Sequence, residues 1–249
     1  MKKNLTYFFL IFISLAFFGC SDDENNPTEP TVEDYSKADY LISINYTLPG
    51  IDAEIKIKPN NQSKIITSAS LTINQEEIFI GNHDESDSNI YYGFYLGTPG
   101  EILNCVVTLN GDVYNINLVY PYYPEIEWPN GLDTSVVNDF VWNLEADNQY
   151  QFFTAYGRSF DWIENVTLDE DSNVINLDPS ARVFNMPINW IKSDLIEYGL
   201  ILEEISFDYD DDLVGICAAT NEIFFGDCRN KSSKNQENKY KEILKLLGY

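Results

Sequence analysis

LNCVVTLNGDVYNINLVY, residues 103–120, carries the clearest structural signal in the chain. Apolar and polar residues alternate on both sides of Asn110-Gly111, which is the pattern of a half-buried β-strand. Asn-Gly is the preferred two-residue hairpin turn, because both of its central residues need positive φ. The stretch therefore predicts two antiparallel strands and favours an all-β fold.

Short strand patterns continue on the N-terminal side of this hairpin. About seven short strands, with turn signals every 8–12 residues, are typical of an immunoglobulin-like β-sandwich. The antibody pattern of two cysteines around a tryptophan is absent, so the prediction concerns architecture alone. The predicted strands are Tyr40–Tyr46, Ala53–Lys58, Ser68–Ile73, Glu77–Ile80, Tyr91–Leu96, Ile102–Leu109 and Val113–Tyr120.

Prolines interrupt the pattern where residues 120–131 read YPYYPEIEWPNG. Proline removes a ladder donor and favours extended backbone, so we place a domain boundary between residues 121 and 122. Strands resume at Phe140–Leu144 and continue to Leu213–Ala219 and Glu222–Phe225. The fold expected is all-β, with two tandem immunoglobulin-like β-sandwich domains at 37–121 and 122–228 and a short C-terminal helix.

The helix is expected at Asn235–Leu247, where Tyr240, Ile243, Leu244 and Leu247 fall at i, i+3, i+4 and i+7. The tail 229–249 is basic, with two acidic residues against six basic ones, and we expect it to dock on the acidic body. The alternative is a frayed basic tail. The basic residues are Arg229, Lys231, Lys234, Lys239, Lys241 and Lys245.

The N-terminus has the parts of a secretory signal peptide. Lys2 and Lys3 precede an almost unbroken apolar run from Leu5 to Phe18, which is too short to span a bilayer as a helix. The alternatives are an ordinary secreted protein cut nearby or a short membrane anchor. We expect a signal peptide at 1–19 and, since residues 21–36 hold six acidic residues and no basic one, an extended linker at 20–36.

Phe17-Phe18-Gly19-Cys20 resembles the lipobox of bacterial lipoproteins, with Gly19 and Cys20 at its two most informative positions and both phenylalanines departing from the strict pattern. The resemblance implies that Cys20 becomes the mature N-terminus and carries covalent lipid, such as palmitate. Cys20-Ser21-Asp22-Asp23-Glu24 is similar to the export signal of Bacteroidota-type surface lipoproteins. This implies an outer-membrane protein that faces the cell exterior; the alternative is an acidic linker with no export role. The resemblance covers residues 1–24 only.

The charge balance excludes one class of partner. The chain has 40 acidic and 15 basic residues, a net charge of −25, and such a surface repels phosphate backbones. Nucleic-acid binding is therefore excluded. Anionic lipid is repelled in the same way, so the acyl chains on Cys20 are expected to make the membrane contact.

Few residues are candidates for chemistry. His83 is the one histidine, and no Gly-x-Ser-x-Gly elbow accompanies it, so we interpret it as a loop residue. Asp208, Asp210 and Asp212 alternate like the start of a calcium loop. Leu213 stands where that loop needs Gly and Ala219 where it needs Glu, which leaves the three aspartates as weak metal candidates.

The other cysteines and one aromatic group give two further candidates. Cys105 is expected to be a buried thiol, and Cys217 and Cys228 are candidates for a disulfide in an oxidising compartment. A tight hairpin at Thr220-Asn221 is the competing arrangement, because it would set Cys217 opposite Phe224. An exposed platform for stacking sugar rings, with interdomain packing as its alternative, is the second candidate. It comprises Tyr120, Tyr122, Tyr123 and Trp128.

These observations favour a membrane-anchored, non-enzymatic binding or assembly module with no cofactor apart from its covalent lipid. Its expected partners are the lipid bilayer and either a glycan or another outer-membrane protein. The alternative function is a glycan-binding accessory protein of an outer-membrane polysaccharide capture system.

Overall fold

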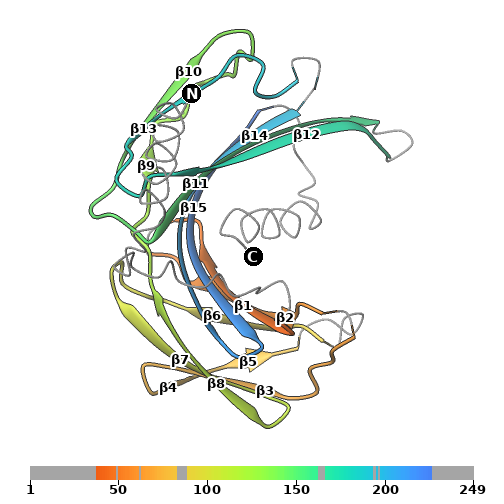
Figure 1. The fold of residues 1–249 in the computed structure, drawn as a ribbon, viewed down its shortest axis with the longest axis vertical. Coiled ribbons are helices and arrows are strands. Elements are labelled where there is room, and N and C mark those ends of the chain that lie inside the picture. The colour runs from red at the N-terminus through yellow and green to blue at the C-terminus, as the bar shows by residue number, and fades with distance from the viewer. Residues whose placement is uncertain are drawn as a thin grey trace, which may run out of the picture. The chain divides into compact units, whose positions relative to one another are not determined.

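In a computed structural model of the chain, strands from both halves of the sequence form one large sheet (Figure 1). The structure describes residues 38–48, 50–61, 63–82, 89–161, 166–192, 195 and 197–225, without the side chains of 160–170. No helix is present in these ranges, so the all-β prediction is confirmed for them. The predicted signal peptide, linker and C-terminal helix lie outside them.

In the part of the chain that the structure describes, fifteen strands form one eight-stranded sheet and two smaller sheets. The strands are β1 (Tyr40–Tyr46), β2 (Ala53–Pro59), β3 (Ala69–Ile73), β4 (Glu76–Ile78), β5 (Ile80–Gly81), β6 (Tyr91–Tyr95), β7 (Ile102–Leu109), β8 (Asp112–Val119), β9 (Glu125–Ile126), β10 (Asn138–Asn143), β11 (Tyr150–Asp161), β12 (Val166–Leu177), β13 (Val183–Met186), β14 (Glu197–Asp210) and β15 (Leu213–Phe225).

The large sheet has the order β12-β11-β14-β15-β1-β2-β6-β5. β1 pairs in parallel with β15, from Tyr40 opposite Leu213 to Tyr46 opposite Ala219, and it pairs antiparallel with β2 on its other side. Parallel strands need a long crossover, and here most of the chain lies between the two partners. The two smaller sheets have the orders β4-β3-β7-β8 and β13-β10-β9.

The expected arrangement of two tandem immunoglobulin-like sandwiches is not confirmed, because the large sheet crosses the predicted boundary at residues 121 and 122. β1, β2, β5 and β6 come from the first half of the chain, and β11, β12, β14 and β15 from the second. The proline-rich segment instead marks the passage from the four-stranded sheet to the three-stranded one. Thr220-Asn221 is no hairpin either, since both residues lie within β15 opposite β14.

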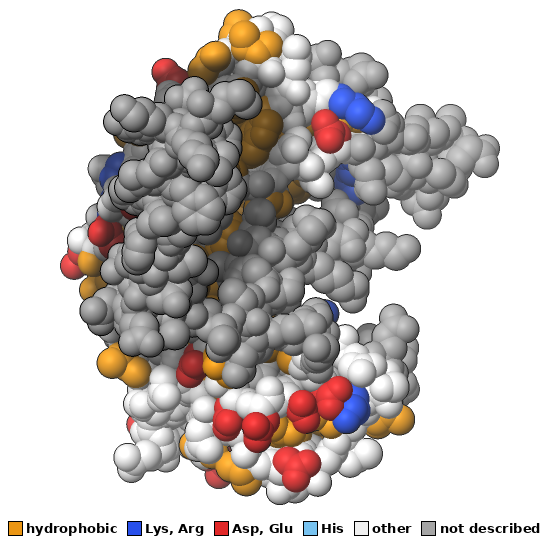
Figure 2. All heavy atoms as spheres, viewed as in Figure 1, with side chains coloured by type: hydrophobic (Ala, Val, Ile, Leu, Met, Phe, Trp, Pro, Cys, Tyr) orange, Lys and Arg blue, Asp and Glu red, His pale blue; other side chains and the backbone are white. Residues whose placement is uncertain are grey.

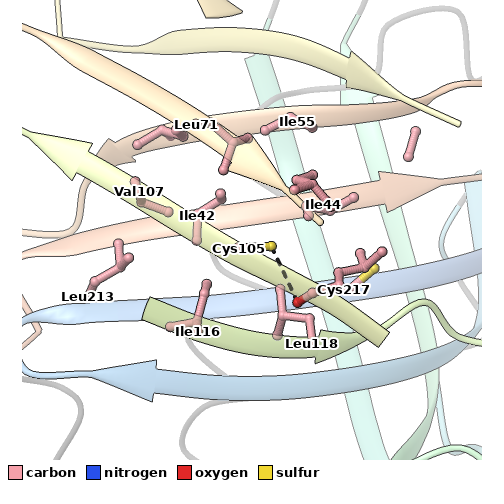
Figure 3. Close-up of a cluster of buried hydrophobic side chains, with 14 of the residues drawn as sticks. Ile42, Ile44, Ile55, Leu71, Cys105, Val107, Ile116, Leu118, Leu213 and Cys217 are labelled. Atoms are coloured by element: carbon pink, nitrogen blue, oxygen red, sulfur yellow. Dashed lines mark hydrogen bonds between the residues drawn. The ribbon is translucent and has the colours of Figure 1, made fainter. Parts of the chain in front are cut away.

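Both small sheets pack on the same face of the large sheet, here named the covered face. The four-stranded sheet closes a core that includes Ile42 and Ile44 of β1, Cys217 of β15 and Val107 of β7 (Figure 3). The three-stranded sheet closes a second core, in which Phe140 and Trp142 of β10 meet residues of β11 and β14. Each fully buried Ile, Leu or Phe of this kind contributes about 1.5–3 kcal/mol to the free energy of unfolding. This two-layer packing is sandwich-like.

The other side of the large sheet, here named the opposite face, carries a third cluster. Because side chains alternate along a strand, neighbours of the covered-face residues point to this side. The described members of this cluster all belong to the large sheet, apart from Ala38, which precedes β1. They are Ala38, Leu41, Phe152, Ile205, Phe207, Val214, Ile216 and Ala218, with Tyr150 and Val174 at the edge.

The predicted Asn-Gly hairpin is present as the turn between β7 and β8. Asn110 and Gly111 have φ of 53° and 99°, the left-handed backbone that this turn requires. The Asn110 side chain accepts a hydrogen bond from the Thr67 N–H at 2.8 Å and donates one to the Ile65 carbonyl at 2.7 Å. The turn therefore also holds the segment that leads into β3.

Candidate functional site

The buried carboxylates of the large sheet lie on β14. Glu197, Glu203 and Glu204 are at most 2% exposed, although carboxylates are rarely buried without partners. Glu197 lies against the guanidinium of Arg158, with Nε at 2.6 Å from Oε2. Glu203 accepts a hydrogen bond from the Thr220 hydroxyl at 3.0 Å. Neighbours along the strand point to opposite faces, so Glu204 lies on the covered face.

Glu204 is the centre of a polar cluster between the two cores of the covered face, here named the junction cluster. Its carboxyl accepts hydrogen bonds from the side-chain amides of Asn148 at 3.0 Å and Gln151 at 2.5 Å. Asn148 also accepts from the Tyr122 N–H and donates to the Tyr122 carbonyl. Tyr46 donates its hydroxyl to the carbonyl of Pro121. The junction cluster thus fixes the chain where it passes between the small sheets.

Burial decides the protonation of this cluster. Loss of water around Glu204 raises its pKa from 4.5 to about 7, and the hydrogen bonds from Asn148 and Gln151 act in the opposite direction. Burial also raises the pKa of the Tyr46 hydroxyl, with the nearby Tyr120 adding to the effect. Near neutral pH, both the protonated and the ionised form of the buried Glu204 carboxyl are therefore populated.

The aspartates that alternate at the end of β14 contact the edge of the four-stranded sheet. The backbone N–H groups of Asn115 and Asn117, on the free side of β8, donate to Asp210 Oδ2 and Asp208 Oδ2, both at 2.6 Å. The N–H of Val119 donates to the Ser206 hydroxyl at 2.8 Å. The two-residue spacing of these acceptors matches the two-residue spacing of the donors.

These side chains replace a missing neighbouring strand, and we name the three contacts the β8 edge ladder. A Cβ at Gly215 would collide with the Ile116 side chain, so glycine at this position allows β8 to lie close to β15. Asp212, the third aspartate of the predicted calcium loop, contributes its backbone carbonyl to the Tyr40 N–H. In the part of the chain that the structure describes, no group of three or more His, Cys, Asp or Glu side chains is placed to hold a metal ion.

The four aromatic residues of the predicted platform do not share one surface. Tyr120 is 2% exposed and stacks on Tyr46 with ring centroids 4.6 Å apart, and Tyr123 packs against the same core. Trp128 packs against the other core and donates its indole N–H to Asn221 at 2.8 Å. Tyr122 is half-buried near the turn at Gly100. Packing of the junction accounts for these contacts.

The predicted cysteine and histidine sites are only partly within the described residues. Cys105 and Cys217 are free, buried thiols of the same core, and burial raises the pKa of Cys105 to about 12. Cys228, the predicted disulfide partner of Cys217, lies outside the described residues, and so do Cys20 and His83. Their roles stay predictions.

The junction cluster was missed in the sequence, although a signal was present. LILEEISF, residues 200–207, places two adjacent carboxylates in an otherwise apolar strand. One of two neighbouring strand residues faces each side of a sheet, so a strand covered on both sides must bury both acids. Such burial needs dedicated hydrogen-bond partners, and Asn148, Gln151 and Thr220 supply them.

Comparison with known proteins adds no relative. No protein-family model matches the chain, and no curated protein matches its sequence. No helix long and apolar enough to cross a membrane is present in the described ranges.

Proposed function

We propose that the chain is a lipid-anchored protein of the outer membrane that presents its β-fold outside the cell as a non-enzymatic binding or assembly module. The observation that carries the proposal is the sequence around Cys20, where a lipobox-like segment is followed directly by Asp22-Asp23-Glu24. Several acyl chains give stable anchoring because each buried methylene adds about 0.8 kcal/mol.

The way in which the linker 20–36 would join the fold supports an anchored role. As the linker expected from the sequence, the residues between Cys20 and Ala38 would have a root-mean-square length of about 20–25 Å, and longer if their charges repel. They lead into β1, which is hydrogen-bonded to β15 on one side and to β2 on the other. Ladder bonds lie across the strand direction, so a pull on the anchor would load both ladders along their whole length.

The surface charge supports a position away from the bilayer. Among the described side chains on the face drawn in Figure 2, acidic ones outnumber basic ones. Such a surface is repelled by anionic lipid headgroups over about one Debye length, roughly 8–10 Å at physiological salt. The acyl chains would then hold the protein at the membrane while the charged body stays in water.

Cys20→Ala is expected to move nearly all of the protein from the membrane fraction to the soluble fraction, because the acyl chains have no other attachment. Fractionation of cells with immunoblotting measures this. Cys228→Ala is the matched control, since it also removes one cysteine and should leave the protein in the membrane. Equal membrane retention of the Cys20 variant and its parent would contradict lipidation at this residue.

Replacing Asp22, Asp23 and Glu24 together by alanine is expected to keep the protein lipidated but to hide it from protease added to intact cells. These residues directly follow Cys20 and its serine neighbour, at the position of the export signal that this segment resembles. The control replaces Glu29, Glu33 and Asp34, which removes the same charge farther along the linker. If both triple variants stay equally accessible to the protease, the acidic run has no role in surface export.

A further inference from the structure

The opposite face of the large sheet has an apolar centre that no other described sheet covers. Phe152, Ile205, Val214, Ile216 and Ala218 are each at most 1% exposed, yet both small sheets pack on the other side. A single sheet cannot bury its own face, since its side chains stand away from it. This face therefore needs a second layer.

We propose that the C-terminal segment of this chain, residues 229–249, is that layer and packs across the opposite face as an amphipathic helix. The sequence gives it one apolar stripe, formed by Tyr240, Ile243, Leu244 and Leu247, with lysines elsewhere. The acidic linker 20–36 has no such stripe, and the segments 83–88 and 162–165 are too short to form one.

The dimensions fit. The cluster spans the adjacent strands β11, β14, β15 and β1, which covers about 14 Å at the usual strand spacing. A helix is about 10–12 Å wide, and residues 235–247 would make one about 20 Å long. One helix of this size covers the cluster.

The chain can also reach this position. β15 ends at Phe225, and Ile216 lies nine residues earlier on the same strand, about 30 Å back along the sheet. Residues 226–234 span up to about 30 Å when extended, so the segment can turn back and deliver residue 235 to the cluster.

Charge favours the same occupant over a second copy of the chain. Glu203 and Glu222 lie on the opposite face beside the cluster. Glu203 is the cross-strand neighbour of Phe152, and Glu222 is the cross-strand neighbour of Ile201. The tail brings six basic residues against two acidic ones, whereas a second copy would bring an acidic body. Lysines flanking the apolar stripe would meet the acids at the rim of the cluster.

A thiol placed on the opposite face tests the proposal. Ser43 lies on this face opposite Ile216 and is 4% exposed, so Ser43→Cys adds a reporter of nearly the same size. The full lipidated chain is used in detergent, with Cys228→Ser in the background, and a maleimide is the probe. Native Cys105, buried on the covered face, reports global unfolding in the same sample.

Ile243→Asp with Leu244→Asp is expected to raise the labelling rate at position 43 about tenfold or more relative to Cys105, since the layer over this face would open locally. Asn235→Asp with Asn238→Asp is the matched control, because it adds the same charge on the polar side of the helix, and it should change the ratio by less than about twofold. If the Ile243/Leu244 variant unfolds, so that Cys105 also reacts, Leu244→Ala takes its place and the same ratio decides.

Four results would overturn the proposal. The ratio could stay unchanged in the tail variant, or rise equally in the control on the polar side of the helix. Protection at position 43 could depend on protein concentration, which would assign the face to a second copy. It could also depend on the detergent or on added lipid, which would assign the face to a lipid surface.

Discussion

Replacing Asp208 and Asp210 together by alanine is expected to lower the free energy of unfolding by about 2–4 kcal/mol, because two charge-assisted hydrogen bonds are lost and water recovers part of each. The bonds join β14 to the N–H groups of Asn115 and Asn117. Urea unfolding of the full chain measures the change. Hydrogen exchange should also speed up at the two amides, which gives a local check.

A matched pair of variants separates the acceptor from the charge. Asp208→Asn with Asp210→Asn keeps a carbonyl oxygen in reach of each N–H, so its loss should be less than half of that in the alanine pair. An asparagine pair that costs as much as the alanine pair would show that the negative charge, and not the acceptor, matters. If the alanine pair is as stable as the parent chain, the β8 edge ladder does not stabilise the fold.

The β8 edge ladder also explains how the four-stranded sheet ends. An edge strand with unpaired N–H groups is a template for pairing with another chain. β8 is eight residues long and alternates cleanly, so its free side would be such a template. Side chains from β14 occupy three of its donors, which joins the small sheet to the large one and blocks the edge in the same step.

Local patterns predicted much of the strand content. β7 has the predicted bounds Ile102–Leu109, and its hairpin with β8 lies around Asn110-Gly111 as expected. Both depend on neighbouring residues: the alternation of apolar side chains and a turn that needs positive φ. The sequence carries such signals wherever a strand has one polar face.

Local sequence patterns could not predict the large sheet, because its strand pairings join segments that are distant in the chain. β1 and β15 are buried on both faces, as in YLI at residues 40–42 and GICAA at 215–219, so alternation is lost and neither partner nor register can be read. Continuous apolar runs of this kind indicate central strands, and a parallel pair is consistent with them. That signal was available, but it does not say which two runs pair.

For the candidate site too, the sequence showed local patterns but not contacts between distant residues. The alternation of Asp208 and Asp210 was visible, but their partners lie more than 90 residues earlier in the chain, so the pattern indicated a weak metal candidate and did not predict the contacts with backbone amides. Tyr120 and Trp128 were visible as neighbours in sequence, whereas the structure assigns them to different cores. Local spacing identifies a polar or aromatic group but does not identify what the group contacts.

Glu204→Gln is expected to raise the free energy of unfolding by about 3 kcal/mol at pH 8 and to change it little at pH 4. Burial raises the pKa of Glu204 from 4.5 to about 7. Between these pH values the folded chain keeps a proton that the unfolded chain has lost, so the contribution of this group to stability falls as pH rises. A shift of this size corresponds to about 3 kcal/mol above the folded pKa. Urea unfolding at pH 4, 6 and 8 measures the difference.

The control must separate burial from net charge, because removing any acid from a chain of net charge −25 lowers its self-repulsion. Glu127→Gln removes an exposed carboxylate and reports that general effect. The excess of the Glu204 variant over this control is the cost of ionising a carboxyl inside the junction cluster. Asn148 can donate to the carbonyl of a glutamine at position 204, and Gln151, whose side-chain oxygen has no hydrogen-bond partner among the described residues, can turn its amide and accept from the new NH2 group. A gain that is equal in both variants, or the same at all three pH values, would mean that the buried carboxyl titrates as if it were in water.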